Sequence, residues 1–268
     1  MERLSLTDFY VVIRSAGERS LPLCQRSVEI NGLDYETIKV SPFWKAVLST
    51  FEIGIRKKRA YTIGLDADII LKKNAIKIIC QNLRQSSNYW KYDFRLQDRF
   101  YPRPIAGVHV YQTAILPLSL NHQPQNLKKI PKPEREFCYQ LKKIGYNDIC
   151  INQVIGRHGY DQYYRDIYQR FRHRAVRNPE DKRQLFDRYR YPNSNDPELL
   201  VAYLGWLDGE KTLRNLAIKQ QIEKIILGKK ISGRIFFPPD ARKKKNISKL
   251  LSKYRLTELQ PVICPRNN

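Results

Sequence analysis

Residues 61–71 read Y-T-I-G-L-D-A-D-I-I-L, an apolar run that carries two carboxylates, Asp66 and Asp68. Isolated carboxylates are costly to bury unless they are paired or bound to a metal. Side chains alternate between the faces of an extended segment, so we expect both acids on one face and Ala67 on the other. Their oxygens suit Mg²⁺ or Mn²⁺, with substrate phosphates completing the shell. The alternative is a pair of ordinary strand-end acids that cap a turn, because a bare D-x-D is common by chance.

The segments that precede this run alternate between strand-like and helix-like patterns. Compact apolar runs predict strands, and apolar stripes at helical spacing predict helices between them. The expected strands are 9–13, 35–40 and 61–65, and the expected helices are 21–30, 42–58 and 74–83. This order predicts an α/β fold with a doubly wound, mostly parallel sheet. Ligands bind beyond the carboxyl ends of the strands in such sheets, where the turn at 14–17 and the two acids both fall.

The second half of the chain is less regular. Residues 86–104 mix aromatic and charged side chains, which indicates a loop or a substrate-facing insertion. A strand is expected over 105–116, a helix over 134–144 and a last strand over 146–154. Beyond Gly156 the chain is rich in Tyr and Arg, with apolar residues at helical spacing. We therefore predict two domains: an α/β domain over residues 1–156 and a basic helical extension over residues 157–268.

Charge and cysteine content limit the partners and the compartment. The formal net charge is +23, and residues 224–255 hold 11 basic residues and one acid. Such a surface predicts an acidic partner, namely nucleic acid, an anionic membrane face or a phosphorylated substrate. No apolar run is long enough to span a bilayer, and no secretory signal is visible. The five cysteines are scattered without a C-x-x-C pair, so we expect a cytoplasmic protein, with peripheral contact to the inner membrane face as an option.

Three stretches together resemble the metal-dependent GT-A glycosyltransferases. They are V-V-I-R-S at 11–15, P-F-W-K-A at 42–46 and A-Y-T-I-G-L-D-A-D-I-I-L at 60–71, and the resemblance covers about residues 9–160. The stretch H-G-Y-D-Q-Y-Y-R-D-I-Y at 158–168 is similar to some bacterial saccharide-cluster transferases. The resemblance implies a GT-A-like fold and the transfer of a sugar from a nucleotide-sugar donor to a saccharide or lipid-linked acceptor.

The resemblance also implies roles for particular residues. Asp66 would lie near the ribose and the metal, and Asp68 would bind the Mn²⁺ or Mg²⁺ ion directly, so these two acids are the expected catalytic pair. The turn after the first strand, Arg14, Ser15 and Ala16, would contact the nucleoside. In the P-F-W-K-A stretch, Lys45 is a candidate for a phosphate contact.

Histidines are the other candidates for the site. Many GT-A enzymes take a further metal ligand from the segment after the sheet, and His158 lies there between glycines, in a predicted loop. The alternative for a lone loop histidine is a solvated side chain, which we expect for His122 and His173. For His109, inside an apolar strand, we expect a core or acceptor-facing side chain with a hydrogen-bond partner.

Two questions stay open at the level of the sequence. A general base would come from Glu134, Glu136 or Asp161, although acids in the first turn of a helix also serve to complement its dipole. The rival functions are a metal-dependent nuclease using Asp66 and Asp68, a nucleic-acid-binding protein using the basic C-terminal region, and a peripheral membrane adaptor.

Overall fold

The computed structural model describes residues 4–83, 88–125, 127–130, 132–177 and 196–210. The chain divides into two compact units. The first comprises Met1–Arg99 and Arg103–His158, and the second comprises Phe100–Pro102 and Gly159–Asn268. The basic stretch at 224–255 lies outside the described residues. Among the described helices, none combines the length and the apolar character that crossing a bilayer requires.

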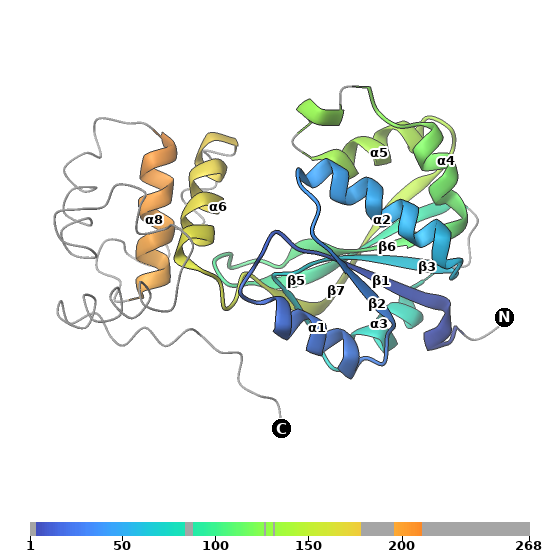
Figure 1. Ribbon diagram of the computed structural model, residues 1–268, viewed down its shortest axis with the longest axis horizontal. Coiled ribbons are helices and arrows are strands. Elements are labelled where there is room, and N and C mark those ends of the chain that lie inside the picture. The colour runs from blue at the N-terminus through green and yellow to red at the C-terminus, as the bar shows by residue number, and fades with distance from the viewer. Residues whose placement is uncertain (1–3, 84–87, 126, 131, 178–195, 211–268) are drawn as a thin grey trace. The chain divides into compact units, whose positions relative to one another are not determined.

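A seven-stranded sheet forms the centre of the first unit, in the order β2-β1-β3-β6-β5-β7-β4 (Figure 1). β1, β2, β3, β5 and β7 run in one direction, whereas β6 and β4 pair antiparallel with their neighbours. The predicted α/β fold with a mostly parallel sheet is therefore confirmed. The strands are β1 Phe9–Arg14, β2 Tyr35–Ile38, β3 Tyr61–Asp66, β4 Ile69–Leu71, β5 Tyr89–Asp98, β6 Ile105–Gln112 and β7 Asn147–His158.

Helices cover both faces of this sheet, as a doubly wound fold requires (Figure 1). α1 and α3 pack on the face that holds Val11, Ile63 and Phe94, and α2, α4 and α5 pack on the face that holds Trp90 and Tyr111. The helices of this unit are α1 Leu21–Ile30, α2 Phe43–Lys57, α3 Ala75–Asn82, α4 Leu116–Asn121 and α5 Pro133–Lys142, with short 3-10 turns at Leu6–Asp8, Thr113–Ile115 and Leu127–Lys129.

Three sequence predictions in this unit were wrong. The strand expected over 105–116 ends at Gln112 and is followed by the 3-10 turn at Thr113–Ile115. The expected loop over 86–104 contains β5, a ten-residue strand between β6 and β7. The last strand does not stop at Val154, because β7 continues to His158. His158 is therefore the final residue of a strand rather than part of a loop, and its backbone position is fixed by pairing with Ile69 of β4 and Asp98 of β5.

The described part of the second unit contains two helices, α6 Tyr164–Arg177 and α8 Pro197–Glu210. They approach closely because α8 has glycines at the contact: a Cβ atom built on Gly205 or Gly209 would collide with backbone carbonyls of α6. Phe171 of α6 packs edge-on against Phe100, with 4.9 Å between ring centroids. In the predicted helical extension, helices are thus present at Tyr164–Arg177 and Pro197–Glu210, whereas residues 178–195 and 211–268 lie outside the described residues.

The packing of α2 against β3 gives the first testable prediction. A Cβ atom on Gly54 of α2 would lie 2.9 Å from Leu116 Cδ1 and 2.9 Å from Thr62 Cγ2. We expect Gly54→Ala to lower the free energy of unfolding by about 1–3 kcal/mol through overpacking, although alanine is the better helix former. Chemical denaturation measures this, with Glu52→Ala at an exposed site of the same helix as control. A Gly54→Ala protein as stable as the parent would show that α2 can move away from β3.

Candidate active site

Arg14 and Asp66 meet at the carboxyl ends of two neighbouring parallel strands. β1 and β3 pair with Arg14 opposite Asp66, and Arg14 Nε donates a hydrogen bond of 2.8 Å to Asp66 Oδ1. The Arg14 side chain is 3% exposed and that of Asp66 is 37% exposed. Desolvation raises the pKa of Asp66 above its ordinary value, and the opposing attraction of Arg14 does not reverse the shift.

Glu134, in the first turn of α5, holds the other side of Arg14. Its Oε1 accepts hydrogen bonds from Arg14 Nη1 at 2.7 Å and from the Tyr111 hydroxyl at 2.8 Å. Its Oε2 lies 3.4 Å from His109 Nε2. Burial alone would raise the pKa of Glu134, but the electrostatic influence of His109 and Arg14 outweighs burial and holds the pKa well below its ordinary value. Glu134 is therefore a charged anchor for Arg14.

The contacts continue from His109 into β5. Asp93 Oδ1 lies 2.6 Å from His109 Nδ1, and Asp93 Oδ2 accepts a hydrogen bond of 3.0 Å from Lys91 Nζ. These contacts lower the pKa of Asp93 despite its burial. The prediction that His109 has a hydrogen-bond partner is confirmed. We call the connected set of charged side chains the ion cluster: Arg14, Asp66, Lys91, Asp93, His109 and Glu134.

A second group of side chains forms where β3, β5 and β7 end. Asp68 lies in the two-residue turn between β3 and β4, and its Oδ2 is 3.1 Å from His158 Nε2. On the other side of the ring, His158 Nδ1 lies 2.6 Å from Oδ2 of Asp98, whose side chain is 0% exposed. We call Asp68, His158 and Asp98 the Asp–His–Asp triad. The structure thus brings together two residues that the sequence analysis named, Asp68 and His158.

The two acids of the D-x-D motif lie in different settings. Asp66 ends β3, whereas Asp68 belongs to the turn that follows, so regular strand alternation does not govern their relative orientation. Asp66 joins the ion cluster through Arg14, and Asp68 joins the triad through His158. The repulsion of Asp68 nevertheless contributes to the raised pKa of Asp66, so the two carboxylates influence each other.

The other predicted binding residues surround the end of β1. The turn closes on itself: Ser15 Oγ donates to Glu18 Oε2 at 2.9 Å, and the Ala16 amide donates to the same oxygen at 2.8 Å. Arg14 is buried within the ion cluster. Lys45, in the first turn of α2, places its Nζ 5.6 Å from the centroid of the Trp44 ring.

The described residues do not enclose a metal by themselves: among them there is no group of three or more His, Cys, Asp or Glu side chains arranged to hold an ion. Asp68 and His158 nonetheless fit as two ligands of a site completed by substrate. Ligands at adjacent corners of an octahedron around Mg²⁺, each about 2.1 Å from the ion, lie roughly 3.0 Å apart. The observed separation of Asp68 Oδ2 and His158 Nε2 is 3.1 Å.

The sequence analysis missed four residues of these two groups: Lys91, Asp93, Asp98 and Tyr111. Three of them lie in β5, which was taken for a loop, and Tyr111 lies in the apolar strand β6. A signal was present, because Trp90, Tyr92, Phe94 and Leu96 alternate with other residues as in a strand. Apart from the contact between Lys91 and Asp93, their partners come from other elements, which no local pattern reveals.

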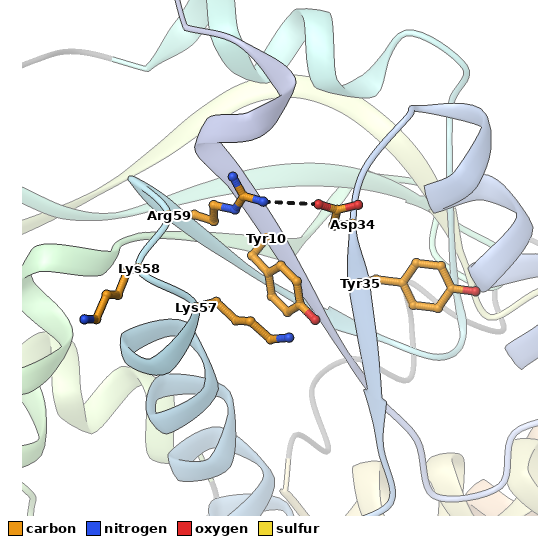
Figure 2. A pocket seen from close by; sticks show the side chains of 6 residues that line it. All are labelled: Tyr10, Asp34, Tyr35, Lys57, Lys58 and Arg59. Carbon is orange, nitrogen blue, oxygen red and sulfur yellow. Dashed lines mark hydrogen bonds and ion pairs between the residues drawn. The ribbon is translucent and has the colours of Figure 1, made fainter.

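A pocket of about 450 Å³ lies at the opposite, amino-terminal edge of β1 and β2 (Figure 2). Its cations lie in the last turn of α2 and directly after it, where positive charge complements the helix dipole. Arg59 pairs with Asp34 at 3.4 Å, and Lys57 pairs with Glu36 at 3.8 Å. Neighbouring acids and the helix end account for these charges. The pocket lies at the other end of the strands from the D-x-D motif and is separate from it. Its lining residues are Tyr10, Asp34, Tyr35, Lys57, Lys58 and Arg59.

Comparison with known proteins gives similarity at the level of structure alone. No protein-family model and no curated protein sequence matches the chain. Among solved structures, the chain is similar to the mannosyltransferase PcManGT from Pyrobaculum calidifontis in complex with GDP-Man and Mn²⁺, at 12% identity and a TM-score of 0.43, over 93% of this chain and 86% of that one. It is also similar to S. aureus TarS 1-349, at 9% identity and a TM-score of 0.41, over 92% of this chain and 82% of that one.

A third similar structure is a glycosyltransferase involved in the glycosylation of the major capsid of PBCV-1, at 10% identity and a TM-score of 0.41. That similarity covers 56% of this chain and 92% of the other chain. Because the TM-scores are below 0.5, these similarities assign neither an activity nor a substrate to this protein.

The ion cluster gives a prediction about stability. Glu134→Gln removes one of the two carboxylates that balance the buried Arg14, so we expect it to lower the free energy of unfolding by roughly 2–4 kcal/mol at neutral pH. The pKa of Glu134 is lower in the folded protein than its ordinary value of 4.5. Its contribution is therefore complete above about pH 4.5 and decreases as the pH falls towards the folded pKa.

Urea denaturation of the parent and Glu134→Gln proteins between pH 8 and pH 3 measures this difference. The control is Glu36→Gln, which removes partly exposed ion pairs with Arg56 and Lys57 and should change stability by no more than about 1 kcal/mol. A parent–variant difference that grew as the pH fell would contradict the assignment of Glu134 as a charged anchor.

Proposed function

We propose that this protein transfers a sugar from a nucleotide-sugar donor to a saccharide or lipid-linked acceptor, using Mn²⁺ or Mg²⁺ held by Asp68 and His158. The observation that carries the proposal is the 3.1 Å approach of His158 Nε2 to Asp68 Oδ2. Two such ligands at the carboxyl end of the sheet leave coordination positions for substrate phosphates and water. In open α/β sheets this edge is where ligands bind.

The chain's own residues divide the work of binding the donor. When bound, the cation supplies positive charge that stabilises the departing nucleoside diphosphate. In this proposal Asp68 and His158 hold the cation. Asp66, which is partly exposed and oriented by Arg14, accepts hydrogen bonds from the nucleotide sugar. Since Arg14 is buried, its contribution to nucleotide binding passes through Asp66 rather than through direct contact.

The turn at 15–16 and the start of α2 are the other parts of the proposed donor site. Ser15 and Ala16 follow Arg14 at the end of β1, where a nucleoside would approach the sheet edge. Lys45 remains the candidate for a phosphate contact, because its ammonium can add charge stabilisation.

The candidate bases differ in suitability. Glu134 has both oxygens near donors and a pKa held well below its ordinary value, so it is a poor proton acceptor. Glu136 accepts a hydrogen bond of 2.8 Å from Gln140 one turn along α5, a local helix contact. Asp161 belongs to the second unit. These contacts favour an anchoring role for Glu134 over a role as the base.

The proposal is tested by nucleotide binding with and without Mn²⁺. We expect the parent protein to bind one of UDP, GDP or CMP more tightly when Mn²⁺ is present. Asp68→Asn should weaken the Mn²⁺-dependent part by at least the roughly tenfold loss that follows removal of outer-shell partners. Isothermal titration calorimetry measures both, with Asp34→Asn at an exposed acid as the matched control.

His158 and His122 form a second matched pair in the same assay. His158→Ala should weaken Mn²⁺-dependent binding, whereas His122→Ala should not, because His122 is exposed and its ring bonds Leu118 O of its own helix. Equal and small effects at both positions would overturn the ligand role of His158. Tight binding of a single-stranded oligonucleotide at physiological salt, with no nucleotide response to Mn²⁺, would favour the nucleic-acid alternative.

The basic stretch at 224–255 carries a separate prediction about the acceptor. Its 11 basic residues should attract an anionic membrane, which would bring the enzyme to a lipid-linked acceptor. Each engaged Lys or Arg contributes about 1 kcal/mol. Co-sedimentation with phosphatidylserine liposomes should therefore occur at low salt and weaken as salt rises. No binding at low salt would exclude the membrane contact.

A further inference from the structure

We infer that Asp98 is a positioning residue, which fixes the ring of His158 so that Nε2 is presented to the cation site beside Asp68. This inference rests on the proposed function, because it assigns Asp98 a role towards the same site. Asp98 does not itself contact the cation in this assignment. Its role is exerted through the imidazole of His158.

The first argument is the contact itself. An ionised carboxylate can only accept hydrogen bonds, so the 2.6 Å contact with Asp98 Oδ2 places a proton on Nδ1 of His158. A histidine that donates through Nδ1 keeps Nε2 for a cation or a second proton. Nε2 is the atom that lies 3.1 Å from Asp68 Oδ2. A proton on Nε2 makes this contact an ion pair with Asp68, and a bound cation would take the place of that proton between the two atoms.

The second argument is the burial of Asp98. Its side chain is 0% exposed, and a buried carboxylate is costly unless it is paired. The side chain of His158 is 18% exposed, so Asp98 is the buried member of the pair and His158 is the partly exposed one. A metal-binding histidine commonly donates its remaining N–H to such a carboxylate, which fixes the tautomer and the ring orientation.

The third argument is the rigidity of the backbone that carries the triad. Asp98 and His158 are paired residues of the parallel strands β5 and β7, and the Arg99 amide donates a hydrogen bond of 3.0 Å to His158 O. On the other side, His158 pairs with Ile69, the residue after Asp68. Strand pairing therefore fixes the backbones of Asp98 and His158, and Asp68 is in the turn directly before a residue paired with His158.

The test uses two substitutions of Asp98 and a readout that is not activity. Asp98→Leu fills the buried volume without an acceptor, whereas Asp98→Asn keeps an oxygen that can accept from Nδ1. We expect Asp98→Leu to weaken Mn²⁺ binding by about 10–100-fold and Asp98→Asn to weaken it by less. Electron paramagnetic resonance of free Mn²⁺ measures binding, with and without the nucleoside diphosphate that the parent prefers.

Nitrogen-15 spectra of histidine-labelled protein loaded with Zn²⁺ give the second readout. The chain has four histidines, so His158→Gln identifies the signals of His158. In the parent protein we expect Nδ1 to carry the proton and Nε2 to be the metal-bound nitrogen. Asp98→Asn should keep this pattern, and Asp98→Leu should lose it. If Asp98 only stabilised the fold, the Asp98→Leu protein would show the same nitrogen-15 pattern as the parent.

Asp34→Asn is the control, because Asp34 is an exposed acid at the opposite edge of the sheet, outside both the ion cluster and the triad. It should leave Mn²⁺ affinity and the His158 signals unaltered. The inference would be overturned, and the proposed function kept, by one combination of results. In that combination both Asp98 variants keep the Mn²⁺ affinity and the His158 signals of the parent, whereas His158→Ala loses Mn²⁺ binding. If the parent binds no Mn²⁺ with any nucleotide, the proposed function fails as well. If Asp98→Leu does not fold, unchanged affinity and an unchanged Nδ1 signal in Asp98→Ser decide against the inference.

Discussion

The buried guanidinium of Arg14 is the interaction on which the arrangement of the site depends. Removing such a charge from water costs several kcal/mol, and only well-placed partners offset that cost. Here the partners are Asp66 on the neighbouring strand and Glu134 at the start of α5, at 2.8 Å and 2.7 Å. Both contacts require β1 and β3 to pair in the observed register and α5 to begin beside the end of β1. The charge of Arg14 thus links the sheet to a helix 120 residues away in the chain.

This constraint separates the two acids of the D-x-D motif. Asp66 forms an ion pair with Arg14, which orients its carboxylate. Asp68 lies in the turn beyond the end of the strand and contacts His158 instead. Had both acids stayed on one strand face, both would have faced the guanidinium. The turn therefore places the two aspartates in different environments: Asp66 beside Arg14 and Asp68 beside His158.

Local sequence signals predicted the first half of the fold well, because each element there carries its own pattern. The apolar runs at 9–13 and 61–65 and the helical stripe through Val47 and Phe51 need no distant partner to be recognised. β5 was missed for the opposite reason. Lys91 and Asp93 occupy positions that burial makes unfavourable, and they are stabilised by His109 and other groups from separate elements. Strand alternation was visible there, but its charged residues were read as a sign of exposure.

The two histidines of the sheet show why residue type and strand position do not settle a role. His109 and His158 each have Nδ1 at 2.6 Å from an aspartate of β5, and each has Nε2 near a second carboxylate. The difference lies in that second carboxylate. Glu134 already accepts hydrogen bonds from Arg14 and Tyr111, which fixes it as a structural anion. Asp68 instead lies in a turn at the edge of the sheet where ligands bind in such folds. Under the proposed function, the same ring geometry therefore serves stability at His109 and cation binding at His158.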